Sequence, residues 1–410
     1  MIYIILIIIN CFLIYYYDYR GNKAHRIEWY LLCLLMFILI GGLRYRLGTD
    51  TIVYQEQFKY TPNLIDFFQG HYENYMNYGL GYLFIASLAK TLGNSFFLLQ
   101  IFQSILVNTV IFYFFYKYTR HIFVAILLYF LLFYFYFIFE IMREACAVAI
   151  FLIGWKYFLN NKWLKYYFCV FLAILFHISA VILILLPILY KIKFINKIFH
   201  FGKSFWVSCI ILLIGGSIIL SRFFDVINLI QIASIQEASD AYSQSDHYGG
   251  EREMSLFRYL TYFFKFILYP FLAFYFLRHY AQDSNKYWNL PNFYSKFEFA
   301  ICFYIYLIIA SIFIYIIHRF SNYFSIFTIL ILSEVIFSKF KDKNKKISLS
   351  LGIWFLLILP FTFPTINGYL KYDEDNSFRL INVYYPYNSI IDQEINRERE
   401  AYYQHIGKFR

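Results

Sequence analysis

The chain has 410 residues, of which 61% are hydrophobic and 15% are charged, and its formal net charge is +11. Soluble domains carry about 25% charged residues, so these charges are too few to cover a globule of this size in water, and a water-soluble enzyme is excluded. The Lys and Arg residues lie between long apolar runs rather than in a basic domain, a pattern that orients membrane proteins and gives no indication of nucleic-acid binding.

Apolar runs recur along the chain at the length that a crossing helix needs, which is roughly 20 residues. In the first half they cover residues 1–17, 27–43, 79–92, 96–116, 121–139, 145–159 and 166–190, and in the second half 204–220, 256–277, 297–317, 320–337 and 347–365. The sequence therefore predicts an all-α, polytopic transmembrane protein with about 12 spans. We expect residues 1–366 to form a single transmembrane domain and residues 367–410 to form a polar C-terminal tail.

Charged loops give these spans an orientation, because short loops rich in Lys and Arg stay in the cytoplasm. The loops with this enrichment are 20–26, 191–203, 278–296 and 339–346. If every run crosses once, these loops fall on one side. We then expect the polar segments 44–78 and 221–254, and the tail, to be extracytoplasmic.

One stretch, residues 121–190, conflicts with simple alternation. Alternation places the lysines of segment 156–165 outside and leaves Arg143 near the inner face. In the alternative arrangement, run 79–92 is re-entrant and the helix around His177 is broken, so that Arg143 faces outside.

Polar residues cluster where the second run ends. Arg44 and Arg46 lie directly behind that run, and Asp50 and Tyr54 follow them. An arginine guanidinium binds two phosphate oxygens at once, but paired arginines at a helix end are also common as interface anchors. Asp50 is either a general base or the partner of these arginines, and both interpretations stay open at this point.

Two further polar groups interrupt the apolar runs of the middle region. Glu140, Arg143 and Glu144 are spaced so that they share one face of a helix, where they form either a structural ion pair or part of a site. His177 precedes Ser179 inside an apolar run. A histidine in that position either packs through a hydrogen bond or transfers protons.

A fourth polar group, formed by His318, Arg319 and Tyr323, lies at a predicted outer boundary, where interface anchors are common. Arginines and histidines at separate sites along a membrane chain suggest an anionic ligand at the bilayer edge. That ligand is either a lipid pyrophosphate or a headgroup bound without catalysis. The motifs of P-loop ATPases, zinc proteases and serine hydrolases are absent, and no cysteine has a metal-ligand spacing. We therefore predict no cofactor and no metal.

At these clusters the chain resembles the EpsG family of bacterial polysaccharide polymerases, which are relatives of the Wzy O-antigen polymerases. The matching pieces occur in the family's order: Leu43-Arg44-Tyr45 with Gly48-Thr49-Asp50 and Tyr54, Met142-Arg143-Glu144 with Ala145, Phe176-His177-Ile178-Ser179-Ala180, Arg319 with Tyr323 and Phe324, and Tyr385-Pro386-Tyr387. Two positions depart from the family pattern. Gly79 stands where the family often has an acidic residue, and Glu144 stands where it usually has Gln. If the missing acid is catalytic in relatives, Asp50 or Glu73 takes its role here.

The resemblance implies a GT-C-like polymerase or ligase architecture and a metal-independent glycosyltransferase activity. Such an enzyme polymerises oligosaccharide repeat units carried on undecaprenyl pyrophosphate, at the outer face of the bacterial cytoplasmic (inner) membrane. Its product is O-antigen, capsule or exopolysaccharide. The expected partners are the lipid-linked donor and acceptor, membrane lipid, and a flippase and a chain-length regulator of the same pathway.

The resemblance also assigns roles to the polar residues. Pyrophosphate binding is expected of Arg44, Arg46, Arg143 and Arg319. The expected catalytic base is His177 or Asp50. Other candidate site residues are Glu140, Glu144, Tyr54, Ser179, His318 and Tyr323.

Two other functional classes remain open. A flippase or transporter of lipid-linked oligosaccharide also needs cationic residues, but such proteins more often show internal repeats, and no repeat is visible in this chain. A related O-antigen ligase or an envelope acyltransferase would use a similar arginine-rich outer site.

Overall fold

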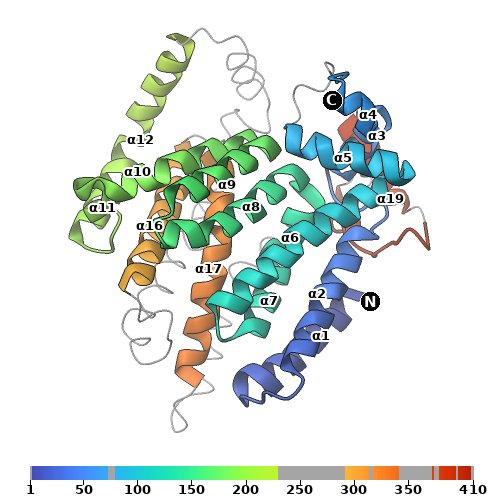
Figure 1. Cartoon of the computed structure of the whole chain (residues 1–410), viewed down its shortest axis with the longest axis horizontal. Helices are drawn as coiled ribbons and strands as arrows, with labels where there is room; N and C mark the ends of the chain where they lie inside the picture. The colour runs from blue at the N-terminus through green and yellow to red at the C-terminus, as the bar shows by residue number, and fades with distance from the viewer. Residues whose placement is uncertain are drawn as a thin grey trace. The chain divides into compact units, whose positions relative to one another are not determined.

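The computed structural model describes residues 2–72, 79–229, 291–313, 317–340, 372–373, 378–393 and 396–407. These residues are helical almost throughout (Figure 1), which confirms the all-α prediction for the part of the chain described. Extended pairing is limited there to a short antiparallel ladder of β1 (Tyr372–Asp373) with β2 (Phe378–Arg379). The chain forms two compact units: the first comprises Met1–Leu183 and Ile336–Arg410, and the second comprises Ile184–Val335.

Three helical stretches of the described residues are long and apolar enough to cross a bilayer: Ile2–Tyr19, Phe96–Tyr118 and Ser295–Phe313. Shorter apolar helices accompany them, as expected for a membrane protein. The predicted spans 256–277 and 347–365 lie outside the described residues. The count of about 12 spans therefore stays a prediction.

The long helical segments of the first unit follow one another in chain order. They are α1 (Ile2–Leu13) with the π-helix η1 (Ile14–Tyr19), α2 (Arg26–Gly42), α6 (Phe96–Tyr118), α7 (Ile122–Tyr129) with the π-helices η3 (Phe130–Tyr134) and η4 (Tyr136–Glu140), α8 (Met142–Leu159) and α9 (Trp163–Phe176). Shorter helices lie between α2 and α6: α3 (Thr51–Tyr60), α4 (Leu64–Phe68) and α5 (Leu80–Gly93).

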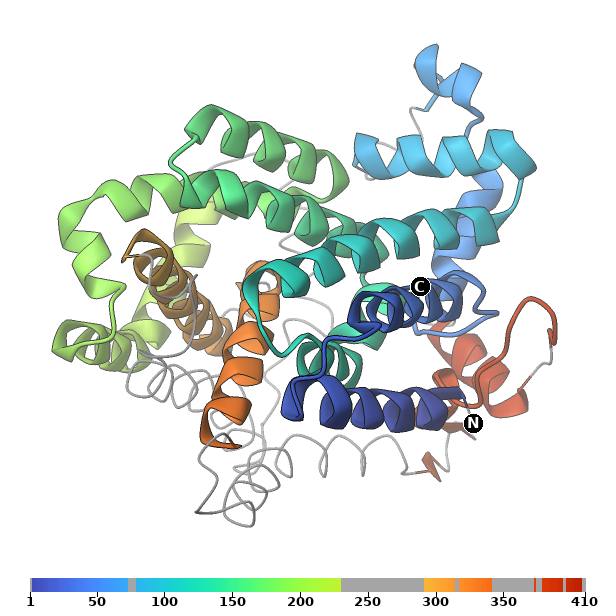
Figure 2. The ribbon, with the colours of Figure 1, turned by 60° about the horizontal axis from the view of Figure 1, so that its bottom comes forward.

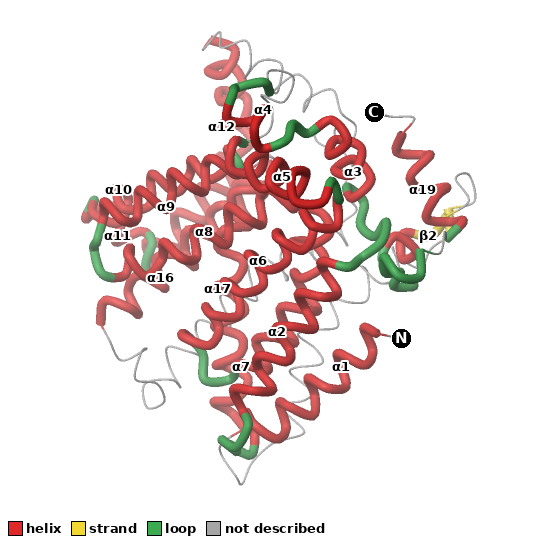
Figure 3. The backbone as a smooth tube through the Cα atoms, turned by 45° about the vertical axis from the view of Figure 1, so that its right-hand side comes forward, coloured by secondary structure: helices red, strands yellow, loops and turns green. Residues whose placement is uncertain are grey.

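Helices α2 and α6 run antiparallel and lie side by side (Figure 3). Tyr30 near the start of α2 contacts Phe112 near the end of α6, with ring centroids 5.6 Å apart. Ser104 near the start of α6 donates a hydrogen bond of 3.0 Å to the carbonyl of Ile38 near the end of α2. The start of α2 therefore lies with the end of α6 at one end of the unit, and the end of α2 lies with the start of α6 at the other.

We name the two ends by the buried charges that lie there. At the Asp18 end, the Asp18 carboxylate accepts hydrogen bonds from the N–H groups of Phe123 and Val124, so that η1 meets the start of α7. At the Arg44 end, Arg44 follows α2, and α6 begins.

Helix α5 belongs to the Arg44 end and does not lead to the Asp18 end. Its Lys90 ammonium donates a hydrogen bond of 2.8 Å to the carbonyl of Lys59 in α3. The hydroxyl of Thr91 accepts one of 2.8 Å from the N–H of Leu64, where α4 begins. The last turn of α5 therefore lies beside α3 and α4, and the chain enters α6 from the same end at which it left α2.

These contacts fit the re-entrant alternative for run 79–92 and do not fit a simple crossing. Because α5 does not cross, α6 leads from the Arg44 end to the Asp18 end, and segment 122–140 leads back. The return is fixed by Glu140, whose carboxylate accepts hydrogen bonds of 2.9 and 3.1 Å from the N–H of Thr49. Glu140 and the start of α8 thus lie with Arg44 and not at the opposite face.

The predicted continuous helix over residues 166–190 is wrong, because it is interrupted at His177. This residue is extended, with φ −154° and ψ 130°, between α9 and the 3₁₀ helix η5 (Ile178–Ile184). Pro187, in α10 (Leu185–Lys191), has no N–H for the carbonyl of Leu183, and the Tyr166 hydroxyl donates to that carbonyl instead, at 2.8 Å. Helix α9 has 14 residues and a length of about 21 Å, which is shorter than the bilayer core.

The C-terminal segment, residues 378–393 and 396–407, belongs to the first unit and packs against its N-terminal part. It contains the 3₁₀ turn η7 (Leu380–Val383) and α19 (Arg397–Gly407). The buried Arg399 guanidinium donates to the carbonyls of Asn382 and Pro386 at 2.8 and 2.7 Å. Figure 2 shows this segment, in red, beside the blue N-terminal helices.

The second unit contains α11 (Lys193–Ile198), α12 (Lys203–Leu229), α16 (Pro291–Phe313) and most of α17 (Ile317–Phe340). The predicted spans 204–220 and 320–337 lie within α12 and α17. Aromatic rings form much of its core, as where Phe199 contacts Phe303 with ring centroids 5.5 Å apart.

Candidate active site at the Arg44 end

The Arg44 side chain is fully buried just beyond the predicted span 27–43. Its guanidinium carbon lies 5.0 Å from the centre of the Phe139 ring. One guanidinium nitrogen donates to the carbonyl of Gly41, and another lies 3.4 Å from the sulfur of Met142. Arg44 thus joins the end of α2 to the end of η4 and the start of α8.

The positive charge of Arg44 has no salt-bridge partner among the described residues, although the charge of the nearby Glu140 favours it. Among the residues that the structure describes, no carboxylate lies within 4.0 Å of its guanidinium, and its buried Nε has no hydrogen-bond partner. Burial lowers the pKa of Arg44 only to about 10, so the group remains a cation at neutral pH. A buried cation without a close counter-charge is unfavourable by several kcal/mol, which is typical of a site that receives an anion.

Glu140 lies just beyond the predicted span 121–139 and holds the Arg44 loop, which comprises residues 43–50 between α2 and α3. Besides the N–H of Thr49, its carboxylate accepts a hydrogen bond from the hydroxyl of Tyr384 in the C-terminal segment. Burial raises the pKa of Glu140 to about 7, and the nearby negative charge of Asp50 adds to this effect. Glu140 therefore titrates near neutrality.

Gly48 allows the loop to pass over the end of η4. Its φ is +104°, and a Cβ there would lie 2.6 Å from the carbonyl oxygen of Phe139. Only glycine combines this conformation with this close approach. The loop therefore brings Thr49 and Asp50 to Glu140 through a position that only glycine can occupy.

Arg143 lies in the first turn of α8, one residue after Met142. Its guanidinium carbon is 5.9 Å from the centre of the Tyr54 ring. Since Met142 contacts Arg44, two arginines flank the start of α8. Glu144, the next residue, is buried in the same turn.

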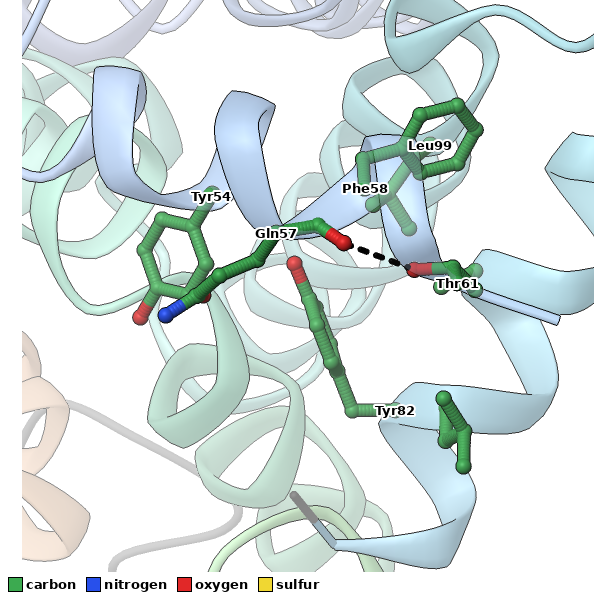
Figure 4. A pocket seen from close by; sticks show the side chains of 8 residues that line it. Tyr54, Gln57, Phe58, Thr61, Tyr82 and Leu99 are labelled. Atoms are coloured by element: carbon green, nitrogen blue, oxygen red, sulfur yellow. Dashed lines mark hydrogen bonds between the residues drawn. The ribbon is translucent and has the colours of Figure 1, made fainter. Parts of the chain in front are cut away.

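A narrow pocket lies between α3, α5 and α6, beside the Tyr54 ring. It is lined by Tyr54, Gln57, Phe58, Thr61, Tyr82, Leu83, Ala86 and Leu99, and has room for about one water molecule. Figure 4 shows Tyr54 and Gln57 from α3 turned toward Tyr82 from α5. The pocket thus places an aromatic and amide lining next to the Arg143 contact.

His177 lies at the break after α9, and its Nδ1 is 2.6 Å from the hydroxyl of Ser179. The N–H of Ser179 also donates to Nδ1, at 3.3 Å. Since Nδ1 accepts, the neutral ring carries its proton on Nε2. The preceding residue, Phe176, packs on the apolar cluster of Tyr54 and Met142, so the break lies close to the other candidate residues.

Arg46 lies in the same loop as Arg44 but contacts a carboxylate. Its Nε and Nη2 donate to the two oxygens of Glu400 in α19, at 2.8 and 2.6 Å. Each of the two side chains is 26% exposed. The predicted role of Arg46 in pyrophosphate binding is not tested by this contact.

His318, Arg319 and Tyr323 belong to the second unit. The first two lie in the first turn of α17, where His318 Nδ1 is 3.0 Å from the hydroxyl of Ser321, and Tyr323 is fully buried. Their participation in a site with Arg44 stays a prediction.

A comparison with protein families decides the assignment. The model of the EpsG family matches residues 26–389, which include the Arg44 loop, the start of α8, the His177 break and the Tyr385-Pro386-Tyr387 sequence. The chain belongs to the EpsG family. This family contains polysaccharide polymerase-like proteins, which gives the chain a glycosyltransferase-like role in making polysaccharide. No curated protein and no solved structure matches the chain.

Several residues of this EpsG-family site are not evident from sequence. Glu400 and Tyr403 contact the Arg44 loop directly, Tyr384 bonds to Glu140, and Arg399 bonds within the C-terminal segment. The only feature of the sequence that points to these residues is the nearby Tyr385-Pro386-Tyr387, one of the pieces that resemble the family. Contacts that join residues 244 to 357 positions apart cannot be derived from local spacing.

No group of three His, Cys, Asp or Glu residues in the described ranges is arranged to hold a metal ion. The expectation of a metal-independent reaction stays a prediction.

Proposed function

We propose that this protein polymerises lipid-linked oligosaccharide repeat units into a surface polysaccharide, at the Arg44 end of the first unit. The donor is a growing chain on undecaprenyl pyrophosphate, and the acceptor is a second lipid-linked unit. The basic loop 20–26, which lies at the opposite, Asp18 end, supports placing the Arg44 end outside the cytoplasmic membrane. The product is an O-antigen, a capsule or an exopolysaccharide.

One observation carries this proposal: two arginines flank the start of α8, and the buried one, Arg44, has no carboxylate within 4.0 Å among the described residues. A pyrophosphate leaving group develops negative charge as its bond to the sugar breaks. Fixed positive charge in a site of low polarity stabilises that change most strongly. Arg143 is assigned to direct contact with the pyrophosphate, and the buried Arg44 acts on the pyrophosphate through its electric field.

The reaction is a single displacement. A hydroxyl oxygen of the acceptor sugar attacks the anomeric carbon of the donor, and the bond from that carbon to the phosphate oxygen breaks. The lipid pyrophosphate leaves with the bonding electron pair, and the acceptor proton passes to a base. A single displacement inverts the anomeric configuration, so a product linkage with retained configuration would contradict this mechanism.

Asp50 and His177 remain the two candidate bases. Asp50 lies beside Glu140, in the loop of Arg44, and is only partly buried. The Nδ1 of His177 faces the hydroxyl of Ser179 at 2.6 Å, so this ring receives the acceptor proton at Nε2, and only in the tautomer with its own proton on Nδ1. We assign the base to Asp50, which lies in the same loop as Arg44, and keep His177 as the alternative base. The pyrophosphate role expected of Arg319, which belongs to the second unit, stays a separate prediction.

The test is a deletion strain complemented with the wild-type gene or with the Arg143→Ala variant. The expected result is loss of long glycan chains in the deletion and the variant, with single repeat units still attached to lipid at the outer face. A matched control is Arg20→Ala, which removes an exposed arginine that stacks on Tyr15 at the other end of the unit. Normal long chains in the deletion strain would exclude a polymerase, and repeat units trapped in the cytoplasmic leaflet would indicate a flippase.

A further inference from the structure

Arg46 and Glu400 are joined although 354 positions separate them in the sequence. The pair is bidentate: Nε and Nη2 of Arg46 donate to the two carboxylate oxygens of Glu400, at 2.8 and 2.6 Å. Such pairs are more specific in geometry than single contacts. The Arg46 guanidinium also lies 5.7 Å from the centre of the Tyr403 ring, so both charged and aromatic contacts tie it to α19.

The main chain around Arg46 is paired with the same C-terminal segment. The N–H of Tyr45 donates to the carbonyl of Asn388 at 2.9 Å, and the N–H of Ile390 donates to the carbonyl of Leu43 at 3.0 Å. Arg44 and Ser389 lie opposite each other between these bonds. The residue that carries the buried charge is therefore held as part of a short antiparallel bridge.

The backbone of Arg46 needs this support. Its φ is +49°, in the left-handed region that side chains other than glycine rarely adopt. The hydroxyl of Tyr403 bonds to the carbonyls of Arg46 and Gly48, at 2.9 Å in both cases. An unfavourable conformation persists where the surrounding contacts over-determine it, and α19 supplies those contacts.

We infer that Arg46 and Glu400 form a latch through which the C-terminal segment positions the Arg44 loop. Arg46 is then a positioning residue, and the predicted pyrophosphate contact is left to the other arginines. The segment becomes part of the polymerase site, because without it the loop would lose its bridge and its support at Arg46. This inference rests on the proposed function only for its glycan readout.

Charge reversal tests the latch. Arg46→Glu and Glu400→Arg are each expected to reduce long-chain glycan about tenfold, since a coupled ion pair of this kind contributes roughly a factor of ten. The double variant restores the attraction with the charges exchanged, and it is expected to recover most of the loss. If Arg46 instead binds pyrophosphate, the double variant stays as inactive as Arg46→Glu, and the latch is overturned.

A second readout does not depend on glycan. Tyr402 and Tyr403 are 9% and 8% exposed, and chymotrypsin cleaves after exposed tyrosines. In the purified full-length protein, each single reversal is expected to speed chymotryptic cleavage within α19, and the double variant is expected to slow it again. Equal cleavage in the single variants and the wild type would overturn the latch even if the glycan is altered.

Controls separate the latch from general effects. Lys59→Glu reverses one partner of the exposed pair with Glu56, whose side chains are 59% and 56% exposed, and should change neither readout. If a reversal prevents folding, Arg46→Gln and Glu400→Gln replace it, and their double variant must be no worse than either one alone. Additive losses would overturn the latch. A deletion strain that makes normal glycan would refute the proposed function while leaving the cleavage result valid.

Discussion

The two ends of the first unit each bury a charge, but they treat it differently. At one end, Asp18 is 8% exposed and accepts a hydrogen bond of 3.2 Å from Arg26 on one oxygen. Its other oxygen accepts bonds of 2.9 and 3.0 Å from the first N–H groups of α7, those of Phe123 and Val124. Every part of this carboxylate has a partner, so its role is to join η1, α2 and α7.

At the other end, Arg44 is more deeply buried and less completely satisfied. It contacts a carbonyl and a sulfur, both weaker partners than a carboxylate, and its Nε has none in the described part of the chain. Asp18 thus has a charged partner in Arg26, whereas no described carboxylate lies within 4.0 Å of Arg44. Under the proposed function, the first charge serves the fold and the second serves the pyrophosphate.

Removing the charge of Arg44 is the strongest test of this difference between the two ends. Arg44→Gln keeps a donor for the carbonyl of Gly41 but no longer stabilises a departing pyrophosphate. We expect a loss of glycan polymerisation of roughly tenfold to a hundredfold, because Arg44 acts through its field and is not a direct transition-state donor. Glycan length and amount are measured against the quantity of folded protein in the membrane. A variant that is unstable but normally active per folded molecule would show that Arg44 is structural.

Asp18→Ala is the reciprocal test. Removing the carboxylate leaves the first N–H groups of α7 without their side-chain acceptor, which costs about 2 kcal/mol. It also removes the partner of Arg26, whose side chain is 32% exposed. The melting temperature of the purified protein should fall, and less folded protein should accumulate. Glycan made per folded molecule should stay at the wild-type level. A selective loss of polymerisation at unchanged stability would mean that the Asp18 end takes part in the reaction.

Much of the first unit was predictable because its signal is local. The runs 27–43 and 96–116 became α2 and α6 with nearly the predicted bounds, since apolar length and flanking charges define such helices. The run 79–92 could not be assigned in the same way. Its composition suits a short span, but Lys90 and Thr91 bond to α3 and α4, and those contacts are not encoded in its own hydrophobicity.

The residues of the candidate site also differ in whether their signal is local or depends on long-range contacts. Arg44, Arg143 and His177 stand out in sequence because polar groups in apolar runs are unfavourable, and the structure brings them toward one end of the unit. Glu140 was evident as a charge, but its bonds to Thr49 and Tyr384 were not. The pairing of Arg46 with Glu400 could not be derived, because it depends on how the last residues of the chain return to the first loop.

Glu140, at the Arg44 end, is expected to make the stability of the protein depend on pH. Burial raises the pKa of Glu140 from 4.5 to about 7, so the folded protein keeps a proton that the unfolded chain releases. The stabilisation from this group is fully present below pH 4.5 and is lost as the pH rises through 7, a change on the order of 3 kcal/mol.

The measurement is the melting temperature of purified wild type and of Glu140→Gln between pH 4.5 and 8. The variant, which stays neutral, should lose part of the decline with rising pH. Glu56→Gln is the control, because its side chain is 56% exposed in an ordinary surface pair. Identical pH profiles for wild type and Glu140→Gln would show that Glu140 is ionised in the fold throughout this range.

The smallest expected effect comes from Gly79, where α5 meets the end of α9. A Cβ there would lie 2.2 Å from the carbonyl oxygen of Leu175 and 2.8 Å from that of Phe176, so Gly79→Ala must push α9 away just before His177. Overpacking of this kind costs about 2 kcal/mol, and moving His177 should also lower polymerisation per folded molecule. Gly215→Ala is the matched control, because a Cβ there meets no atom within 4 Å. If Gly79→Ala lowers the melting temperature but leaves polymerisation unchanged, His177 does not act in the reaction, and the site at the Arg44 end is confined to the arginines and Asp50.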